Sequence, residues 1–285
     1  MKTDQVKIQV ISFIAAGLFA FSACTPVPTD VEPSISPTLP EPTATFTIQP
    51  TLTPILATPT PDLSEDVCSP LEGETLSELT EIITRPYTPT RLGFDEGHPG
   101  LDFSFFRRKE LLSIDNLPVL SALEGVVSTV LIERLPYGHA VIIETPIESI
   151  SPELLERFQL PKQQSIVEPD PKFNCAPPGD AKTYEADSRS IYILYAHLKN
   201  PVTLGIGEKV NCGQQIGNVG DSGKEYSTNP HLHFETRIGP SGARFDSMAY
   251  YTLDSTQSER YNYCVWRVSN QFQLFDPMLL LNDQE

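Results

Sequence analysis

Residues 231–235 read His-Leu-His-Phe-Glu and stand in an extended, apolar stretch of the chain. Successive side chains of a β-strand point to opposite faces, so His231 and His233 project from the same face. Two imidazoles in this arrangement can hold a metal ion, or they can line a polar face of a sheet. The stretch therefore predicts a strand, and the other histidines decide between the two uses.

Four of the five histidines lie in three short motifs. Residues 98–102 read His-Pro-Gly-Leu-Asp, which sets an imidazole and a carboxylate four residues apart. Residues 195–198 read Tyr-Ala-His-Leu and end a run rich in β-branched and aromatic residues. The Pro-Gly pair disfavours a helix between His98 and Asp102, so this is not the helical His-Glu-x-x-His zinc motif. A turn leading into a strand must bring the two side chains together.

The order and spacing of these motifs resemble the lysostaphin-type or LytM-domain zinc metallopeptidases, which cut the peptide part of bacterial cell walls. The resemblance extends over about residues 91–281. Its matching segments are residues 97–103 (Gly-His-Pro-Gly-Leu-Asp-Phe), 137–143 (Tyr-Gly-His-Ala-Val-Ile-Ile), 205–210 (Gly-Ile-Gly-Glu-Lys-Val), 213–217 (Gly-Gln-Gln-Ile-Gly) and 276–277 (Asp-Pro). The implied fold is mainly β, a twisted antiparallel sheet with a zinc groove and few short helices.

The resemblance also implies one zinc ion, with His98, Asp102 and His233 as its ligands. Three protein ligands and an open fourth position are typical of catalytic zinc. His197 and His231 match the catalytic histidines of the family. One is expected to act as general base and the other, protonated, to stabilise the oxyanion, and the sequence leaves their order open.

Glu235 and His139 belong to neither the predicted zinc ligands nor the predicted catalytic histidines. Glu235 is two residues beyond His233, so it either accepts the N–H of the ligand imidazole or forms a structural salt bridge. His139 follows a Tyr-Gly turn and is expected to be a surface or turn histidine outside the zinc set.

The hydrophobic pattern favours short strands broken by glycine and proline. The expected strands are residues 119–121, 125–133, 140–144, 190–197, 209–210, 215–219 and 231–237. Two segments lengthen this core, at about residues 146–190 and 238–275. The first predicts a helix at 151–160 and is expected either to border the zinc groove or to pack away from it. The second carries Tyr250, Tyr251, Tyr261, Tyr263 and Trp266, which either shape the groove or pack in the core.

The first 24 residues have the layout of a secretory signal, with Lys2 and Lys7 before an apolar run. The run ends in Phe-Ser-Ala before Cys24, which resembles the lipobox of bacterial lipoproteins. Cys24 is then expected to carry a lipid that anchors the protein to the outer face of the cell membrane. An ordinary signal peptide with an incidental cysteine is the alternative.

Residues 25–66 are expected to form a disordered tether. Residues 25–61 contain ten prolines and ten threonines and no Lys, Arg or Gly, so they cannot offset their ordering entropy by burial. Residues 67–285 then form one metallopeptidase domain with 18 basic and 30 acidic residues. This balance excludes a nucleic-acid partner. The expected partners are peptidoglycan peptides and, through Cys24, the membrane, and the protein is expected to be a monomer.

Four cysteines remain beyond Cys24, an even number that fits disulfides in an exported protein. Three pairings are open, and so is the alternative of free buried thiols. We expect Cys68 with Cys264 and Cys175 with Cys212, because ties on terminal extensions stabilise most.

The sequence thus predicts a zinc metalloendopeptidase that hydrolyses peptidoglycan cross-links or stem peptides. One alternative is a catalytically inactive LytM-like module that regulates a cell-wall amidase. Another keeps the zinc but acts on exported proteins or foreign walls. All five histidine and aspartate positions are filled, which favours the enzyme over the inactive module.

Overall fold

The computed structural model describes residues 63–64, 66–184, 187–223 and 226–282. The chain divides into two units, Met1–Ala57 and Thr58–Glu285. The first unit lies outside the described residues, and so do the expected signal peptide, Cys24 and most of the tether. In the described part of the chain, no helix has the length and apolar character needed to cross a membrane.

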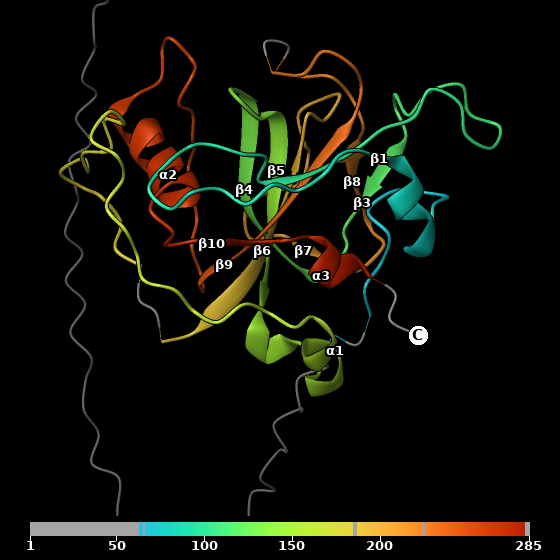
Figure 1. Cartoon of the computed structure of the whole chain (residues 1–285), viewed down its shortest axis with the longest axis horizontal. Coiled ribbons are helices and arrows are strands. Elements are labelled where there is room, and N and C mark those ends of the chain that lie inside the picture. Colours follow the sequence, from blue (N-terminus) through green and yellow to red (C-terminus); the bar gives the residue numbers. More distant parts are fainter. Residues whose placement is uncertain (1–62, 65, 185–186, 224–225, 283–285) are drawn as a thin grey trace, which may run out of the picture. The chain divides into compact units, whose positions relative to one another are not determined.

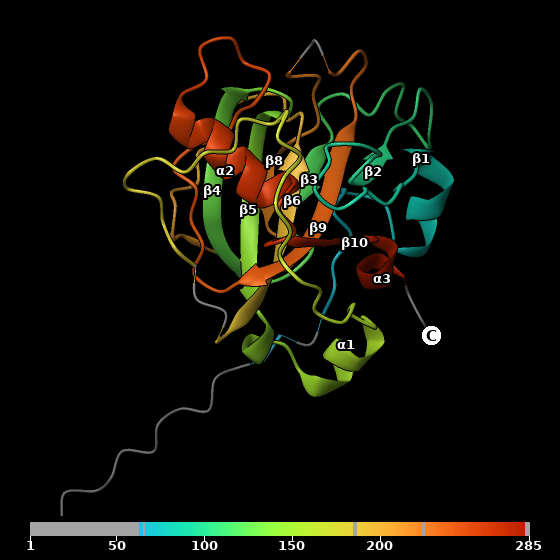
Figure 2. The ribbon, with the colours of Figure 1, turned by 60° about the vertical axis from the view of Figure 1, so that its left-hand side comes forward.

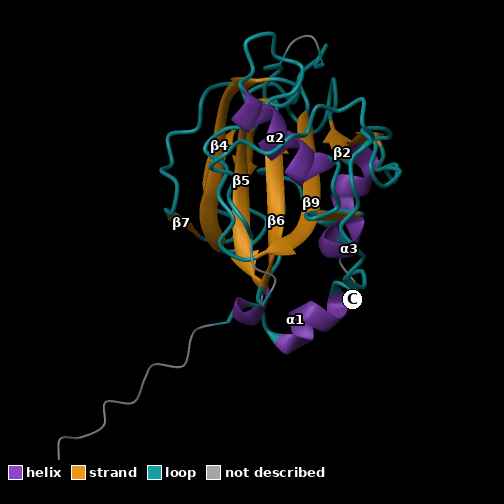
Figure 3. Ribbon diagram, turned by 90° about the vertical axis from the view of Figure 1, so that its left-hand side faces the viewer, coloured by secondary structure: helices purple, strands orange, loops and turns teal. Residues whose placement is uncertain are grey.

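An eight-stranded antiparallel sheet forms the body of the second unit (Figures 1 and 3). Its strand order is β1-β2-β9-β6-β5-β4-β7, and β10 pairs with β9 beside this path. The strands are β1 (Ile83–Arg85), β2 (Gly100–Phe103), β4 (Gly125–Arg134), β5 (Gly138–Pro146), β6 (Arg189–Ala196), β7 (Lys209–Val210), β9 (Leu232–Pro240) and β10 (Gln273–Phe275). A second small sheet pairs β3 (Pro118–Leu120) with β8 (Gln215–Asn218).

The helices are short and few. They are the 3-10 helices η1 (Ser77–Ile82) and η2 (Ile147–Ser149) and the α-helices α1 (Pro152–Arg157), α2 (Gln257–Arg267) and α3 (Met278–Leu281). Thr256 and Glu259 form a capping box that starts α2. The expectation of a mainly antiparallel β fold with few helices is confirmed.

Both faces of the sheet are buried because apolar side chains point to each face in turn. Ile193 and Tyr195 of β6 lie in one core, which also contains side chains of α1 and the small sheet. Tyr192 and Leu194 point the other way into a second core, where Trp266 of α2 packs. Figure 2 shows α2 crossing this second face.

All seven predicted strands are present within a few residues of their expected ends. Strands β1, β2 and β10 were not predicted, because three or four residues give no periodicity to recognise. Helix α1 lies inside the predicted range 151–160, and the side chain of Ser151 caps it by accepting a hydrogen bond from the Leu154 N–H. Helix α2 was also missed, because its first four residues (257–260) are all polar and its aromatic and apolar residues are confined to 261–266.

The expected disulfide pairing is wrong. The bonds join Cys68 to Cys212 and Cys175 to Cys264, with Cα–Cα distances of 5.6 and 5.7 Å. The N-terminal segment returns along β3, where the Cys68 N–H donates to the Ala122 carbonyl, and this places Cys68 beside the turn that carries Cys212. Cys264 lies on α2 and faces the connection between β5 and β6 instead.

That connection leaves β5 at Pro146 and returns at Arg189, because β5 and β6 are antiparallel neighbours. Pro146 pairs with Ser190, at the end of β6 that lies far from His197. Leu154 and Phe158 of this connection enter the first core. The connection therefore begins away from the histidine motifs and packs as part of the scaffold.

Candidate metal centre

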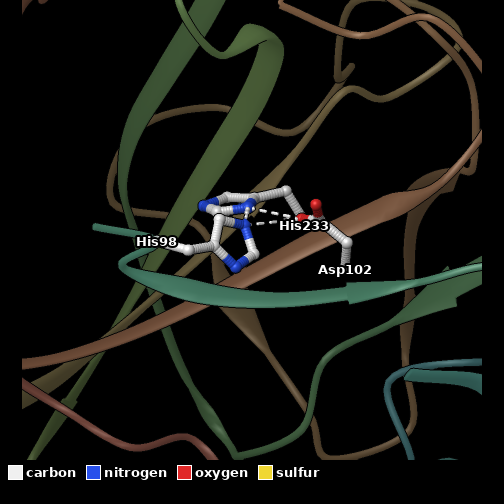
Figure 4. Close-up of side chains that lie close together, drawn as sticks. All are labelled: His98, Asp102 and His233. Carbon is white, nitrogen blue, oxygen red and sulfur yellow. Dashed lines mark hydrogen bonds and ion pairs between the residues drawn. The ribbon is translucent and has the colours of Figure 1, made fainter. Parts of the chain in front are cut away.

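Three ligand atoms from two motifs meet on the second face of the sheet (Figure 4). The His98 Nε2 atom lies 3.0 Å from Asp102 Oδ1 and 3.2 Å from His233 Nδ1. The His233 Nδ1 atom lies 2.8 Å from the same Asp102 oxygen. All three side chains are buried, so these polar atoms have little access to water.

Strand register explains the meeting. Asp102 on β2 stands directly opposite His233 on β9, so the two side chains share one face. Residues 98–100 turn into β2 so closely against β9 that a Cβ on Gly100 would lie 2.3 Å from the Phe234 carbonyl oxygen. Only glycine allows this approach, which brings His98 back over Asp102.

Each imidazole has its other nitrogen fixed by a hydrogen bond. The His98 Nδ1–H donates to the Pro86 carbonyl at 3.0 Å, which leaves Nε2 free for the centre. The His233 Nε2–H donates to Glu235 Oε2 at 3.4 Å, which leaves Nδ1 free. These tautomers follow from the hydrogen-bond partners.

Glu235 combines the two interpretations that the sequence left open. One carboxylate oxygen contacts His233, and the other accepts a hydrogen bond from the Arg237 Nε–H. The Arg237 Nη1–H donates to the Phe272 carbonyl at 2.8 Å. Glu235 is thus both the orienting partner of a ligand imidazole and half of a buried salt bridge.

The donor set fits zinc. Ligand atoms 2.0–2.1 Å from a tetrahedral ion lie about 3.3 Å from one another, close to the observed edges of 2.8, 3.0 and 3.2 Å. Two histidine nitrogens and one carboxylate oxygen are ligands that zinc prefers. His98, Asp102 and His233 would therefore hold the ion.

The electrostatics of the cluster also favour a cation. Burial by itself would raise the pKa of the Asp102 carboxyl, but hydrogen bonds with His233 and His98 lower it far below its usual range. Burial opposes the protonation of His233, yet Asp102 and Glu235 raise its pKa to about 9. The protein thus stabilises positive charge at this point, which a metal ion would also supply.

His197 reaches the centre by leaving the strand. Alternation along β6 would place it on the face of Tyr195, which is opposite to the face of His233. Instead β6 ends at Ala196, and His197 has a φ of 61°, in the left-handed region. Its ring centroid lies 4.6 Å from that of His231 and 5.9 Å from that of His233. The turn at His197, and not the alternation of a regular strand, therefore places its side chain at the centre.

Backbone carbonyls orient both additional histidines. The His197 Nδ1–H donates to the Ser222 carbonyl at 2.8 Å, and the His231 Nδ1–H donates to the Asn229 carbonyl at 2.8 Å. The His231 Nε2 atom lies 3.7 Å from Asp102 Oδ1. Burial and the nearby charges of His233 and His231 lower the pKa of His197 to about 3, so its Nε2 atom is unprotonated at neutral pH.

All five predicted site residues line one pocket of about 200 Å³. A polar cluster that was not predicted forms part of its wall. Asp95 accepts hydrogen bonds from the hydroxyls of Tyr251 (2.5 Å) and Tyr263 (2.8 Å) and from the Arg267 Nε–H. The tyrosines in the sequence signalled this wall, whereas nothing in the sequence connected Asp95 to them.

Two expectations about nearby segments need correction. His139 is buried in β5, not on the surface, and its Nδ1 atom accepts a hydrogen bond from the Glu133 N–H at 3.3 Å. It lies outside the set of three ligand atoms, as expected. None of residues 146–190 lines the pocket among the described residues, so this segment is not a groove wall.

The chain matches a known peptidase family over part of its length. Residues 183–246 match the model of Peptidase family M23. This segment includes His197, His231 and His233, and it supports an M23 peptidase domain in the chain. None of the curated proteins matches this sequence.

Several solved structures are similar over larger parts of the chain. The catalytic domain of the antimicrobial peptidase lysostaphin from Staphylococcus simulans is 20% identical, with 73% of this chain and 97% of that chain covered and a TM-score of 0.35. A mutant catalytic domain of the prophage-encoded M23 protein EnpA from Enterococcus faecalis is 18% identical, with 56% and 82% covered and a TM-score of 0.32. A zinc containing peptidase from Vibrio cholerae is 23% identical, with 54% and 32% covered and a TM-score of 0.30. These values are too low to transfer a substrate or a residue's role.

Proposed function

We propose that this protein is a zinc-dependent metalloendopeptidase that hydrolyses peptide bonds of peptidoglycan cross-links or stem peptides. The observation that carries the proposal is the convergence of the His98, Asp102 and His233 ligand atoms within 4.8 Å of one another. Two more imidazoles stand in the same pocket. The match to family M23 and the resemblance to LytM-type peptidases support the substrate class.

A bound zinc ion supplies an activated water and polarises the scissile carbonyl. The protein supplies the proton transfers. His197 and His231 each have Nδ1–H fixed on a carbonyl, so each turns Nε2 toward the reacting groups. One Nε2 atom accepts the proton of the attacking water and passes it to the leaving amine, and the other, on a protonated imidazole, donates a hydrogen bond to the oxyanion.

Glu235 and Arg237 keep the site rigid. Their ion pair is fully buried, and Glu235 fixes the ring of His233 from behind. A ligand held in one orientation loses less entropy when the metal binds and keeps its angle during turnover.

We also propose that Cys24 anchors the enzyme by a lipid at the outer face of the membrane and that residues 25–66 serve as its tether. The lipobox-like Phe-Ser-Ala-Cys sequence and the proline-rich composition support this. Metabolic labelling with a fatty-acid analogue tests it, because Cys24→Ser should abolish the label. Equal labelling of the wild type and the variant would contradict the anchor.

The enzyme function is tested by a digest of purified peptidoglycan with the Cys24→Ser chain, read by mass spectrometry. We expect new peptide termini with wild-type histidines and their formation about 10²–10⁴-fold more slowly with the added change His231→Ala. A zinc-loaded protein that yields no new termini, but stimulates a purified cell-wall amidase, would support the inactive regulatory module instead.

A further inference from the structure

Four charged side chains besides the histidines line the pocket: Arg85, Asp95, Asp102 and Arg267. Three of them have partners in the protein. Asp95 pairs with Arg267, and Asp102 is held by His98 and His233. Their charges are therefore balanced by partners in the pocket wall or in the metal centre.

Arg85 is different. No hydrogen bond or ion pair joins its guanidinium to any other residue in the described part of the chain. It lies on β1, at the edge of the sheet, directly opposite Asp102 on β2. The register thus places an exposed, unpaired cation next to a metal ligand.

The charge of the pocket contrasts with that of the whole chain. The chain has a formal charge of −17, whereas the four charged pocket residues contribute two positive and two negative charges. A zinc ion would make the pocket positive. An acidic protein with a locally cationic pocket attracts an anionic group there while repelling polyanions elsewhere.

We propose that Arg85 binds a free carboxylate of the substrate peptide, so that the enzyme prefers peptides that carry this carboxylate near the scissile bond. The inference rests on the proposed peptidase function and narrows its substrate class. A guanidinium suits the task because its paired N–H donors match the two oxygens of a carboxylate. Peptidoglycan peptides offer such carboxylates at chain ends and on side chains, and amidation removes their charge without changing their size.

The test compares two stem peptides that differ only in one carboxylate, free or amidated. Their binding and cleavage are measured with the wild type, Arg85→Gln, Arg85→Lys and Arg107→Gln. Arg107 is a matched control, since it is also exposed and unpaired in the described part of the chain but lies outside the pocket. Binding is measured by calorimetry with an uncleavable analogue of each peptide, so the readout does not depend on turnover.

We expect the wild type to bind the free carboxylate about tenfold to a hundredfold more tightly than the amide, as for a charge-assisted hydrogen bond. Arg85→Gln should remove this preference without changing amide binding, and Arg85→Lys should restore part of it. Arg107→Gln should behave as the wild type.

Equal affinity of the wild type for both peptides, or an equal loss for both in Arg85→Gln, would overturn the inference. The two proposals fail separately. If the carboxylate preference is present but neither peptide is cleaved, the peptidase function fails and the Arg85 subsite stands. If both peptides are cleaved and bound alike, the function stands and Arg85 is only an exposed charge on an edge strand.

Discussion

Two long connections are added to the sheet, and they differ in their relation to the pocket. The β5–β6 connection (residues 147–188) and the β9–β10 connection (residues 241–272) both leave the sheet at the end away from His197. The second crosses the face of the sheet and gives Tyr251, Tyr263 and Arg267 to the pocket wall. The first gives the wall none of its described residues.

The layer that each connection occupies explains the difference. The β9–β10 connection reaches the β4–β5 hairpin, where the Tyr250 N–H donates to the Leu135 carbonyl. Leu154 and Phe158 of the β5–β6 connection lie in the core on the other face. A later part of it packs on the outside of the β9–β10 layer, because Cys175 is bonded to Cys264 of α2 and Phe173 lies beside it. A long connection shapes a site only if it lies directly on the face that carries the site.

The largest effect on turnover is expected from the two histidines proposed to transfer protons, His197 and His231. His197→Ala and His231→Ala should each reduce turnover by about 10²–10⁴-fold, because proton transfer and oxyanion stabilisation are lost. Zinc content should stay near that of the wild type. Rates on a peptidoglycan peptide and elemental analysis test this together. Loss of zinc from either variant would make that histidine a ligand and not a catalytic group.

Asp95→Asn should remove the ion pair that holds Arg267 of the β9–β10 connection in the pocket wall. The buried guanidinium of Arg267 loses its counter-charge, so we expect a loss of about 3–5 kcal/mol in the free energy of unfolding. Urea denaturation measures it, with Asp246→Asn as an exposed control.

The same carboxylate gives a dependence of stability on pH. Burial would raise the pKa of Asp95, but Arg267 and the two tyrosine hydroxyls lower it below its usual value. The stabilisation is therefore present above the unfolded pKa of about 4 and is lost as pH falls below it. Asp95→Asn should reduce this loss in acid, and an unchanged acid profile would contradict the role of Asp95.

Cys264→Ser removes the disulfide that joins the β5–β6 connection to the β9–β10 connection. The expected loss in the free energy of unfolding is about 2–4 kcal/mol, with little change in KM, because the bond lies behind the pocket wall. Peptide mapping under non-reducing conditions tests the pairing directly. A cross-linked Cys68–Cys264 peptide would contradict it.

The smallest effect on catalysis is expected when the β5–β6 connection is removed. Replacement of residues 148–188 by a short Gly-Ser link should lower stability, since Leu154 and Phe158 leave the core, but should keep the cleavage pattern and KM. Cys264→Ser is the matched control for the lost disulfide. A broader cleavage pattern in the zinc-loaded variant would show that the β5–β6 connection borders the groove after all.

Much of the sheet was predictable because its strands are regular. Residues 126–132 and 191–196 are mostly β-branched, aromatic or other apolar residues, and both segments lie in strands. Strand β2 is four residues long, and its pairing with β9 depends on a glycine turn and not on periodicity. The prediction of the disulfide pairing failed because the pairing depends on the path of the N-terminal segment along β3.

The motifs predicted which residues meet in the pocket but not the geometry that brings them together. The motifs singled out His98, Asp102 and His233, and the structure brings their ligand atoms together. His197 broke the alternation rule, since a positive φ turned its side chain to the other face. Asp95 and Arg85 could not be found from the sequence, because their places depend on long-range pairing that no local pattern encodes.

Zinc content is the most direct test of the metal centre. The purified wild type should retain about one zinc per chain by elemental analysis, and so should His139→Asn, a buried histidine variant outside the ligand set. His233→Ala should lose the metal and the peptidase activity together. Near-stoichiometric zinc in folded His233→Ala would contradict the centre built from His98, Asp102 and His233.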